Sequence, residues 1–249
     1  MSRRSAIDCP SLWCPAVSEA YPIHLRPSAP LAPRVLLPGD PHHALGVAQA
    51  ILYEPRMFNH TRGLWGYTGR AADGQPLTIQ STGMGGPSAA IVVEELIDLG
   101  ARTLVRIGTC GALVGGLALG ELIVAGRAIG ADGASRALGV EDGVDADAAL
   151  TCALCRGGAR EVTAVSTDLF YDHGDEALHA AWIGAGAQVV EMETATLLAL
   201  ARRRRVQAGV LLAVTDLPAG EGRAPIELEE LRTLGVRLGE TAWAALASG

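Results

Sequence analysis

The sequence predicts an α/β protein, a three-layer single domain whose central, largely parallel mixed β-sheet is flanked by helices. Two observations support this prediction. Short apolar runs bounded by turn residues alternate along the chain with amphipathic helical patterns, which is typical of a parallel sheet covered on both faces. The composition, with 49% hydrophobic residues, 31 glycines and only 19% charged residues, suits tight turns and close packing of helices on a sheet.

The elements follow one another with few long gaps. Strands are predicted where apolar residues form short runs, at residues 35–37, 77–80, 104–107, 121–125, 161–165, 189–192 and 210–214. Helices are predicted where apolar residues recur with helical spacing, at 41–53, 88–99, 145–155, 176–182, 194–204 and 227–247. We find no internal repeat and no linker, so we expect an N-terminal extension over residues 1–20 and one domain over residues 21–249 of the 249.

The charge and hydropathy pattern excludes several classes of protein. The net charge of −7 argues against a nucleic-acid partner, which would favour a basic face. The basic run Arg202 to Arg205 ends a predicted helix, where cations suit the helix dipole and the solvent. No apolar stretch reaches the roughly 18 residues of a membrane span, and Met1 to Ala20 lacks the apolar core of a signal peptide. We therefore expect no membrane partner, a mobile N-terminal extension and a cytoplasmic location.

The five cysteines do not suggest a disulfide framework, because their number is odd and the chain is long. Cys152 and Cys155 have CxxC spacing, and Cys9 with Cys14 would complete a set of four thiolates for zinc. We favour the simpler interpretation, in which Cys152 and Cys155 share one face of a predicted helix. No metal site is predicted.

Residues able to carry chemistry fall repeatedly after predicted strands. Ligands of α/β sheets bind beyond the carboxyl ends of the strands, so these residues predict one composite pocket. They are Gly39-Asp40, Gly83 to Gly85, Arg106 to Gly111, Glu191 to Glu193 and Thr215-Asp216.

A glycine-rich turn joins one strand to an amphipathic helix within Ser81–Leu96. Glycines let backbone N–H groups approach a ligand, and a helix N-terminus attracts anions. These sixteen residues resemble the signature of the purine nucleoside phosphorylase and uridine phosphorylase family. The resemblance extends from about Tyr21 to the C-terminus and implies the nucleoside phosphorylase-I fold. It also implies that inorganic phosphate is the co-substrate and that no cofactor is needed.

An anion site is predicted around Arg106, at the end of an apolar strand, and Thr109 in the following turn. An arginine buried there must be paired or must bind a ligand, so an internal salt bridge is the alternative. The resemblance assigns phosphate binding to Arg106, Thr109 and the Gly39 amide, and to Arg62 reaching a neighbouring subunit. His43 stands where the family usually has a phosphate-binding arginine, and histidine is shorter and only partly charged near neutral pH.

A ribose site is predicted at Glu191-Met192-Glu193, because a carboxylate can accept hydrogen bonds from two sugar hydroxyls. Acids at the N-terminus of a helix are the alternative, since the helix dipole favours them. The resemblance assigns ribose binding to Glu193, Met192, Met84 and His24, with His24 reaching a neighbouring subunit.

A base site is predicted at Asp216, where a carboxylic acid could protonate purine N7 as the glycosidic bond breaks. An Asp turn or a helix cap is the alternative. The resemblance implies that Phe170 stacks on the base and that Tyr171 lines the site, although both could be core aromatics. Further base contacts are expected from Cys110, Gly111 and Glu191. Asp216 is typical of the purine branch of the family.

The expected function is phosphorolysis of purine (deoxy)ribonucleosides to free base and (deoxy)ribose 1-phosphate, in purine salvage. Asp216 and Arg106 are the expected catalytic residues. Uridine phosphorylase, a hydrolytic nucleosidase and a non-catalytic nucleoside-binding protein stay open as alternatives. The resemblance implies a homo-oligomer built from dimers, with a homohexamer as the expected assembly.

Overall fold

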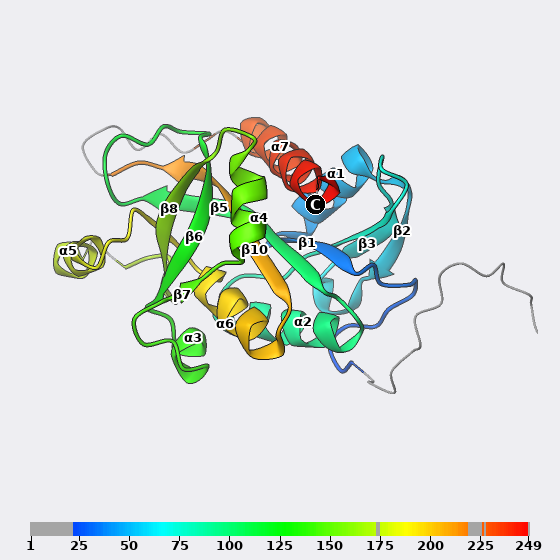
Figure 1. Ribbon diagram of the computed structural model, residues 1–249, viewed down its shortest axis with the longest axis horizontal. Coiled ribbons are helices and arrows are strands. Elements are labelled where there is room, and N and C mark those ends of the chain that lie inside the picture. Colours follow the sequence, from blue (N-terminus) through cyan, green and yellow to red (C-terminus); the bar gives the residue numbers. More distant parts are fainter. Residues whose placement is uncertain (1–21, 173–174, 219–225, 227, 249) are drawn as a thin grey trace, which may run out of the picture.

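The computed structural model describes residues 22–172, 175–218, 226 and 228–248, and a ten-stranded mixed sheet lies at its centre (Figure 1). The expected extension over residues 1–20 lies outside the described residues. The strands are β1 (Arg34–Pro38), β2 (Tyr53–Asn59), β3 (Gly66–Arg70), β4 (Pro76–Gln80), β5 (Thr103–Ala112), β6 (Leu122–Gly130), β7 (Val144–Asp145), β8 (Arg160–Ser166), β9 (Val189–Glu191) and β10 (Gln207–Asp216).

Helices cover both faces of this sheet, as the sequence predicts. They are α1 (Pro41–Ile51), α2 (Gly86–Asp98), α3 (Gly133–Ala137), α4 (Ala148–Cys155), α5 (Glu176–Gly184), α6 (Thr194–Arg204) and α7 (Leu228–Ala247), with a short 3-10 turn at Thr61–Gly63. Within the described residues, none of these helices is long and apolar enough to cross a membrane.

The sheet is less parallel than predicted. Its order is β10-β6-β8-β9-β5-β1-β4-β3-β2, and β10 also pairs with β5, so five of the strands close into a barrel. Strand β5 runs parallel to β1 and β10 and antiparallel to β9. The edge strands β2, β3 and β4 form an antiparallel meander. The carboxyl ends of β1, β5 and β10 therefore meet at one end of the sheet.

Alternate residues of β10 enter two separate cores. Val210, Leu212 and Val214 pack with α2 and α6, whereas Leu211 and Ala213 pack with α1 and α7. All five are fully buried. A strand that is buried on both faces has a continuous run of apolar residues in its sequence. Strand β10 could be predicted for this reason.

Two local predictions were wrong. The first helix was expected to reach residue 53, but α1 ends at Ile51. Residues 53–59 form strand β2 instead, and most of this strand is exposed. The helix expected over 145–155 begins at Ala148, because the Asp147 side chain accepts a hydrogen bond from the Leu150 N–H and caps it. The preceding residues pair with β6 as β7.

Candidate active site at the carboxyl ends of the strands

A cavity of about 630 Å³ lies where β1, β5 and β10 end, between α7 and α5. Helix α7 closes one side of it with Leu231, Leu234, Gly235 and Leu238. The predicted composite pocket therefore exists. Its lining includes every predicted site residue except His24, Arg62 and Tyr171. The predicted residues that line it are Gly39, His43, Met84, Arg106, Thr109, Cys110, Gly111, Phe170, Glu191, Met192, Glu193 and Asp216.

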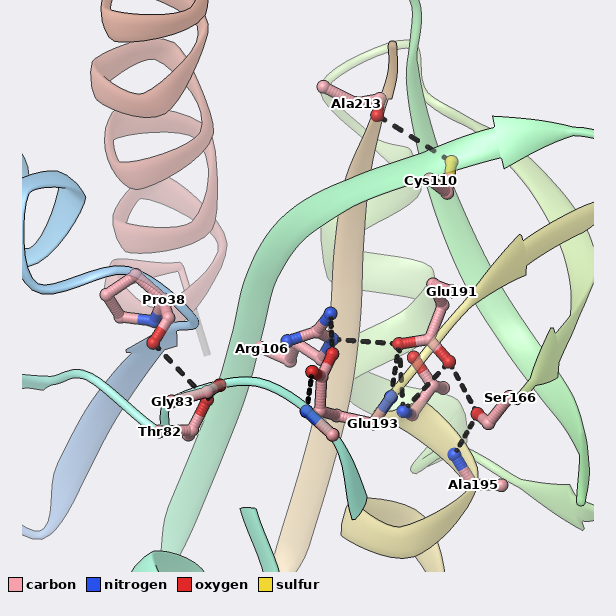
Figure 2. A network of polar contacts seen from close by, with 12 residues as sticks. Pro38, Thr82, Gly83, Arg106, Cys110, Ser166, Glu191, Glu193, Ala195 and Ala213 are labelled. Carbon is pink, nitrogen blue, oxygen red and sulfur yellow. Dashed lines mark hydrogen bonds and ion pairs between the residues drawn. The ribbon is translucent and has the colours of Figure 1, made fainter. Parts of the chain in front are cut away.

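Arg106 lies at the centre of a buried ion-pair network (Figure 2). Its Nε donates to Glu191 Oε2 at 3.1 Å, and its Nη2 pairs with Glu193 Oε2. Burial alone would lower the pKa of Arg106, but the charges of Glu193 and Glu191 outweigh burial and raise it above its ordinary value. The arginine is therefore permanently charged; it is internally paired and buried, and it lines the cavity.

Glu191 orients the rest of this network. Its Oε2 also accepts from the backbone N–H groups of Glu193 and Thr194, and its Oε1 accepts from Ser166 Oγ at 2.5 Å. These contacts cap the first turn of α6, as the alternative interpretation of the two acids anticipated. Base binding by Glu191 stays a prediction, and both of its carboxylate oxygens already accept hydrogen bonds.

Glu193 is held from two sides. Its Oε1 accepts from the Gly85 N–H at 2.5 Å, within the glycine-rich turn before α2. Gly85 has a φ of 85°, a conformation that favours glycine. Burial raises the pKa of Glu193 above its ordinary value, although the charge of Arg106 lowers it in part. Ionised Glu193 can accept further hydrogen bonds, which suits a diol.

Strand β5 continues past Arg106 to Ala112, and Gly108 within it leaves space for the Arg106 side chain. A Cβ atom on Gly108 would lie 3.0 Å from Arg106 Nη2 and 3.1 Å from Cζ. The glycine therefore lets the guanidinium fold back over its own strand toward the two glutamates. The sequence shows this glycine without indicating that its role is steric.

Asp216 is directed to the cavity by an irregularity in β10. The register to β5 shifts between Val214, which faces Cys110, and Asp216, which faces Gly111. Such a bulge re-aims the side chains that follow it. Asp216 Oδ2 accepts from Thr215 Oγ1 at 3.1 Å, and the carboxyl group is half-buried.

Cys110 contributes a neutral surface to the same wall. Its thiol donates to the Ala213 carbonyl oxygen at 3.7 Å, and burial raises its pKa far above the ordinary value. The thiol therefore stays protonated and is no nucleophile.

His43 lies in the first turn of α1 and packs against α7. A Cβ on Gly235 would be in ordinary contact with the imidazole ring, 3.6 Å from its Cγ and Cδ2. Asp40 caps α1 by accepting from the N–H groups of His42 and His43. The ring thus lines the cavity from the side of α7, where the sequence predicts a phosphate contact.

Three predicted residues do not line the cavity of this single chain. His24 Nδ1 pairs with Glu95 Oε1 at 2.7 Å, and Arg62 is exposed with a φ of 60°. Both are expected to reach a neighbouring subunit, which stays a prediction. Tyr171 is 80% exposed and packs edge-on against Phe170.

Sequence reasoning missed three lining residues that lie on α5 and on the segment before it. Asp172, Glu176 and His179 line the cavity beside Phe170, and no strand end or motif signals them. Among the described lining residues there are then six carboxylates, two imidazoles and one arginine. The carboxylates are those of Asp40, Asp172, Glu176, Glu191, Glu193 and Asp216.

Comparisons with known proteins show the family of this chain. Residues 33–247 match the family model described as the phosphorylase superfamily. The purine nucleoside phosphorylase DeoD-type of Clostridium perfringens is 36% identical over 75% of this chain and 82% of that protein. The corresponding protein of Geobacillus kaustophilus is 37% identical over 75% and 81%. The uridine phosphorylase of Treponema pallidum is 35% identical over 72% and 76%. The chain therefore belongs to the phosphorylase superfamily, as a pentosyl-transferring enzyme of the nucleoside phosphorylase kind.

Proposed function

We propose that this enzyme is a purine nucleoside phosphorylase. The observation that supports it best is that Asp216 shares one cavity with Arg106 and Glu193. One bound nucleoside and one phosphate can then reach all three groups that the reaction needs. Asp216 is the proton donor for the base, Arg106 the cation for phosphate and Glu193 the acceptor for the ribose hydroxyls. The relatives named purine nucleoside phosphorylase add support, since they match this chain over three quarters of its length.

In the proposed reaction a phosphate oxygen attacks C1′ of the sugar as the C1′–N9 bond breaks. The electron pair of that bond passes to the base, and the Asp216 carboxylic acid gives its proton to N7. Positive charge that develops on the sugar is stabilised by the bound phosphate, so differential binding of the transition state lowers the barrier. The products are the free base and (deoxy)ribose 1-phosphate.

Each part of the cavity has a proposed task. Arg106, Thr109, His43 and the Gly39 amide bind phosphate, with Arg62 from a neighbouring subunit. Glu193, Met192 and Met84 hold the ribose, together with His24 from the neighbour. The base contacts Asp216, Cys110, Gly111 and Phe170 and, at the rim, Tyr171.

Glu191 has a second proposed task besides its predicted contact with the base, which is to orient Arg106, because its Oε2 accepts from the arginine Nε. We further propose a dimer-based homo-oligomer, a hexamer in its full form, that works in purine salvage in the cytoplasm. Inorganic phosphate is the co-substrate, and no cofactor takes part.

Uridine phosphorolysis is the second candidate, because one relative is a uridine phosphorylase. Product formation separates the candidates when inosine, adenosine, methylthioadenosine and uridine are each supplied with and without phosphate. Phosphate-dependent release of a purine with a sugar 1-phosphate supports the proposal. Preferential turnover of uridine supports the second candidate, and release of free sugar without phosphate contradicts both.

A further inference from the structure

The aromatic ring of Phe170 lines the cavity but is held by few contacts. Its side chain is 69% exposed, and its ring packs edge-on against exposed Tyr171 at 5.0 Å between centroids. The preceding Leu169 is 65% exposed. Side-chain packing therefore does little to fix the ring, and the backbone on either side of it must set its position.

On its N-terminal side this segment is anchored to the sheet and to α3. The Thr167 N–H donates to the Glu191 carbonyl oxygen at 2.9 Å, and Asp168 Oδ2 accepts from the Gly133 N–H at 2.8 Å. These contacts hold the chain only as far as residue 168. Phe170 lies two residues beyond them.

On its C-terminal side the segment is anchored by a pair of side chains. Asp172 Oδ2 lies 2.5 Å from His179 Nε2, and the two side chains are 23% and 33% exposed. The imidazole also stacks on Trp182, at 5.5 Å between centroids and 28° between planes. Trp182 is buried and packs with Val165 and Ala187. A continuous line of contacts thus runs from a small core to the segment that carries Phe170.

We propose that Asp172 and His179 are positioning residues that hold Phe170 over the base of the bound nucleoside. The proposal rests on the proposed function, which assigns the stacking to Phe170. Both members of the pair line the same cavity as Phe170, so the contact is made at the site itself. Half-exposed ion pairs contribute little to folding stability, and Trp182 anchors α5 independently. The effect of the pair is therefore expected in ligand binding rather than in the melting temperature.

The expected change in KM and kcat depends on the stage of the reaction at which the base stacks on Phe170. A base stacks on Phe170 both before and during bond cleavage, so a loss of this contact raises KM and leaves kcat nearly unchanged. Loss of one stacking contact corresponds to about a tenfold rise in KM for the nucleoside. The KM for phosphate stays unchanged, because Arg106 does not contact this segment.

The test compares Asp172→Asn and His179→Leu with a conservative variant, His179→Gln, whose amide keeps a donor near the position of Nε2. Asp145→Asn is the matched control, since it removes an exposed carboxylate from a pair with Arg127 that lies outside the cavity. We expect the first two variants to raise the nucleoside KM about tenfold at unchanged melting temperature. His179→Gln and Asp145→Asn should stay within about twofold of the parent.

A second set of variants shows whether the pair acts through Phe170. In a Phe170→Ala background, Asp172→Asn should add nothing, because the ring that it positions is gone. Additive effects would overturn the proposal, as would a fall in kcat at constant KM or an unchanged KM in the single variants.

Failure of this proposal is distinguishable from failure of the proposed function. If the parent enzyme cleaves purine nucleosides with phosphate and Asp172→Asn leaves every constant unchanged, only the positioning role is wrong. If the parent shows no turnover, the proposed function is wrong. Calorimetry then gives the dissociation constant of adenosine for the same variants. A roughly tenfold rise of this constant in Asp172→Asn and His179→Leu supports the positioning role, and an unchanged constant contradicts it.

Discussion

Gly108 lies against the guanidinium of Arg106, so closely that a Cβ at position 108 would come within 3.0 Å of Nη2. A Cβ at position 108 would make a tight contact with the guanidinium that pairs with Glu191 and Glu193, so one of the two groups would have to shift by a few tenths of an ångström. We therefore expect Gly108→Ala to displace the proposed phosphate-binding cation without removing it.

The expected result of Gly108→Ala is a rise of about tenfold in KM for phosphate, the worth of one misplaced charge-assisted hydrogen bond. Initial-rate kinetics at varied phosphate measure it. Gly46→Ala is the control, since its Cβ would meet nothing within 4 Å. An unchanged KM would show that the guanidinium does not need this space.

Asp216→Asn removes the proposed proton donor for the base. We expect the rate of purine nucleoside cleavage to fall by about 100-fold, the scale of general acid catalysis. A substrate whose base leaves readily without a proton should lose much less, which serves as the internal control. Equal losses for both substrates would place Asp216 outside the proton transfer.

His43→Arg restores the longer cation that related sequences lead us to expect at this position. Because Arg is permanently charged and can bind phosphate in a bidentate manner, KM for phosphate should fall by about tenfold near neutral pH. His43→Ala should raise it. Kinetics at saturating nucleoside distinguish the three enzymes, and identical constants would remove residue 43 from the phosphate site.

The pH profile should report Glu193. Its pKa is raised by burial, so as the pH falls it takes up a proton earlier than an ordinary glutamate, whose value is 4.5. The protonated group no longer accepts from both ribose hydroxyls and loses its ion pair with Arg106. The acid limb of kcat/KM should therefore have an apparent pKa above 4.5. In Glu193→Gln the remaining activity should lack this limb; a limb that persists would have another origin.

A site shared between subunits predicts complementation. Arg62→Ala should weaken phosphate binding in the site of the neighbouring subunit, whereas Asp216→Asn should disable the site of the subunit that carries it. When the two impaired variants are co-expressed, half of the dimers carry one intact site, so roughly a quarter of parental activity should come from intact sites. Mixing the same proteins after separate purification is the control. Absence of recovery would place Arg62 outside a shared site.

The sequence was sufficient for the parts of the fold that are buried on both faces. Strands β1, β4, β5 and β10 are apolar runs, so their existence and the pocket at their ends could be predicted. Strands β2 and β3 could not, because β2 is largely exposed and β3 contains two glycines. Strand β2 depends on pairing with β3, and β3 on pairing with β4.

The site was predicted as a set of residues but not as a network. Arg106 and Glu191 are 85 positions apart, so no local pattern shows that they pair. The internal salt bridge that was the alternative for Arg106 is observed, and the side chain also lines the cavity, so its phosphate binding stays a prediction. The helix over residues 176–182 was predicted, but the pair of Asp172 and His179 was missed, because no sequence pattern shows that a side chain of α5 contacts the segment before the helix.

The six carboxylates that line the cavity also decide which solutes enter it. One arginine and two imidazoles do not balance them, so the interior potential is negative whenever most of the acids are ionised. A neutral nucleoside crosses this field without electrostatic cost, whereas inorganic phosphate, the proposed co-substrate, enters against it. The anion therefore depends on the cation of Arg106, the single arginine of the described lining, to stay in the cavity.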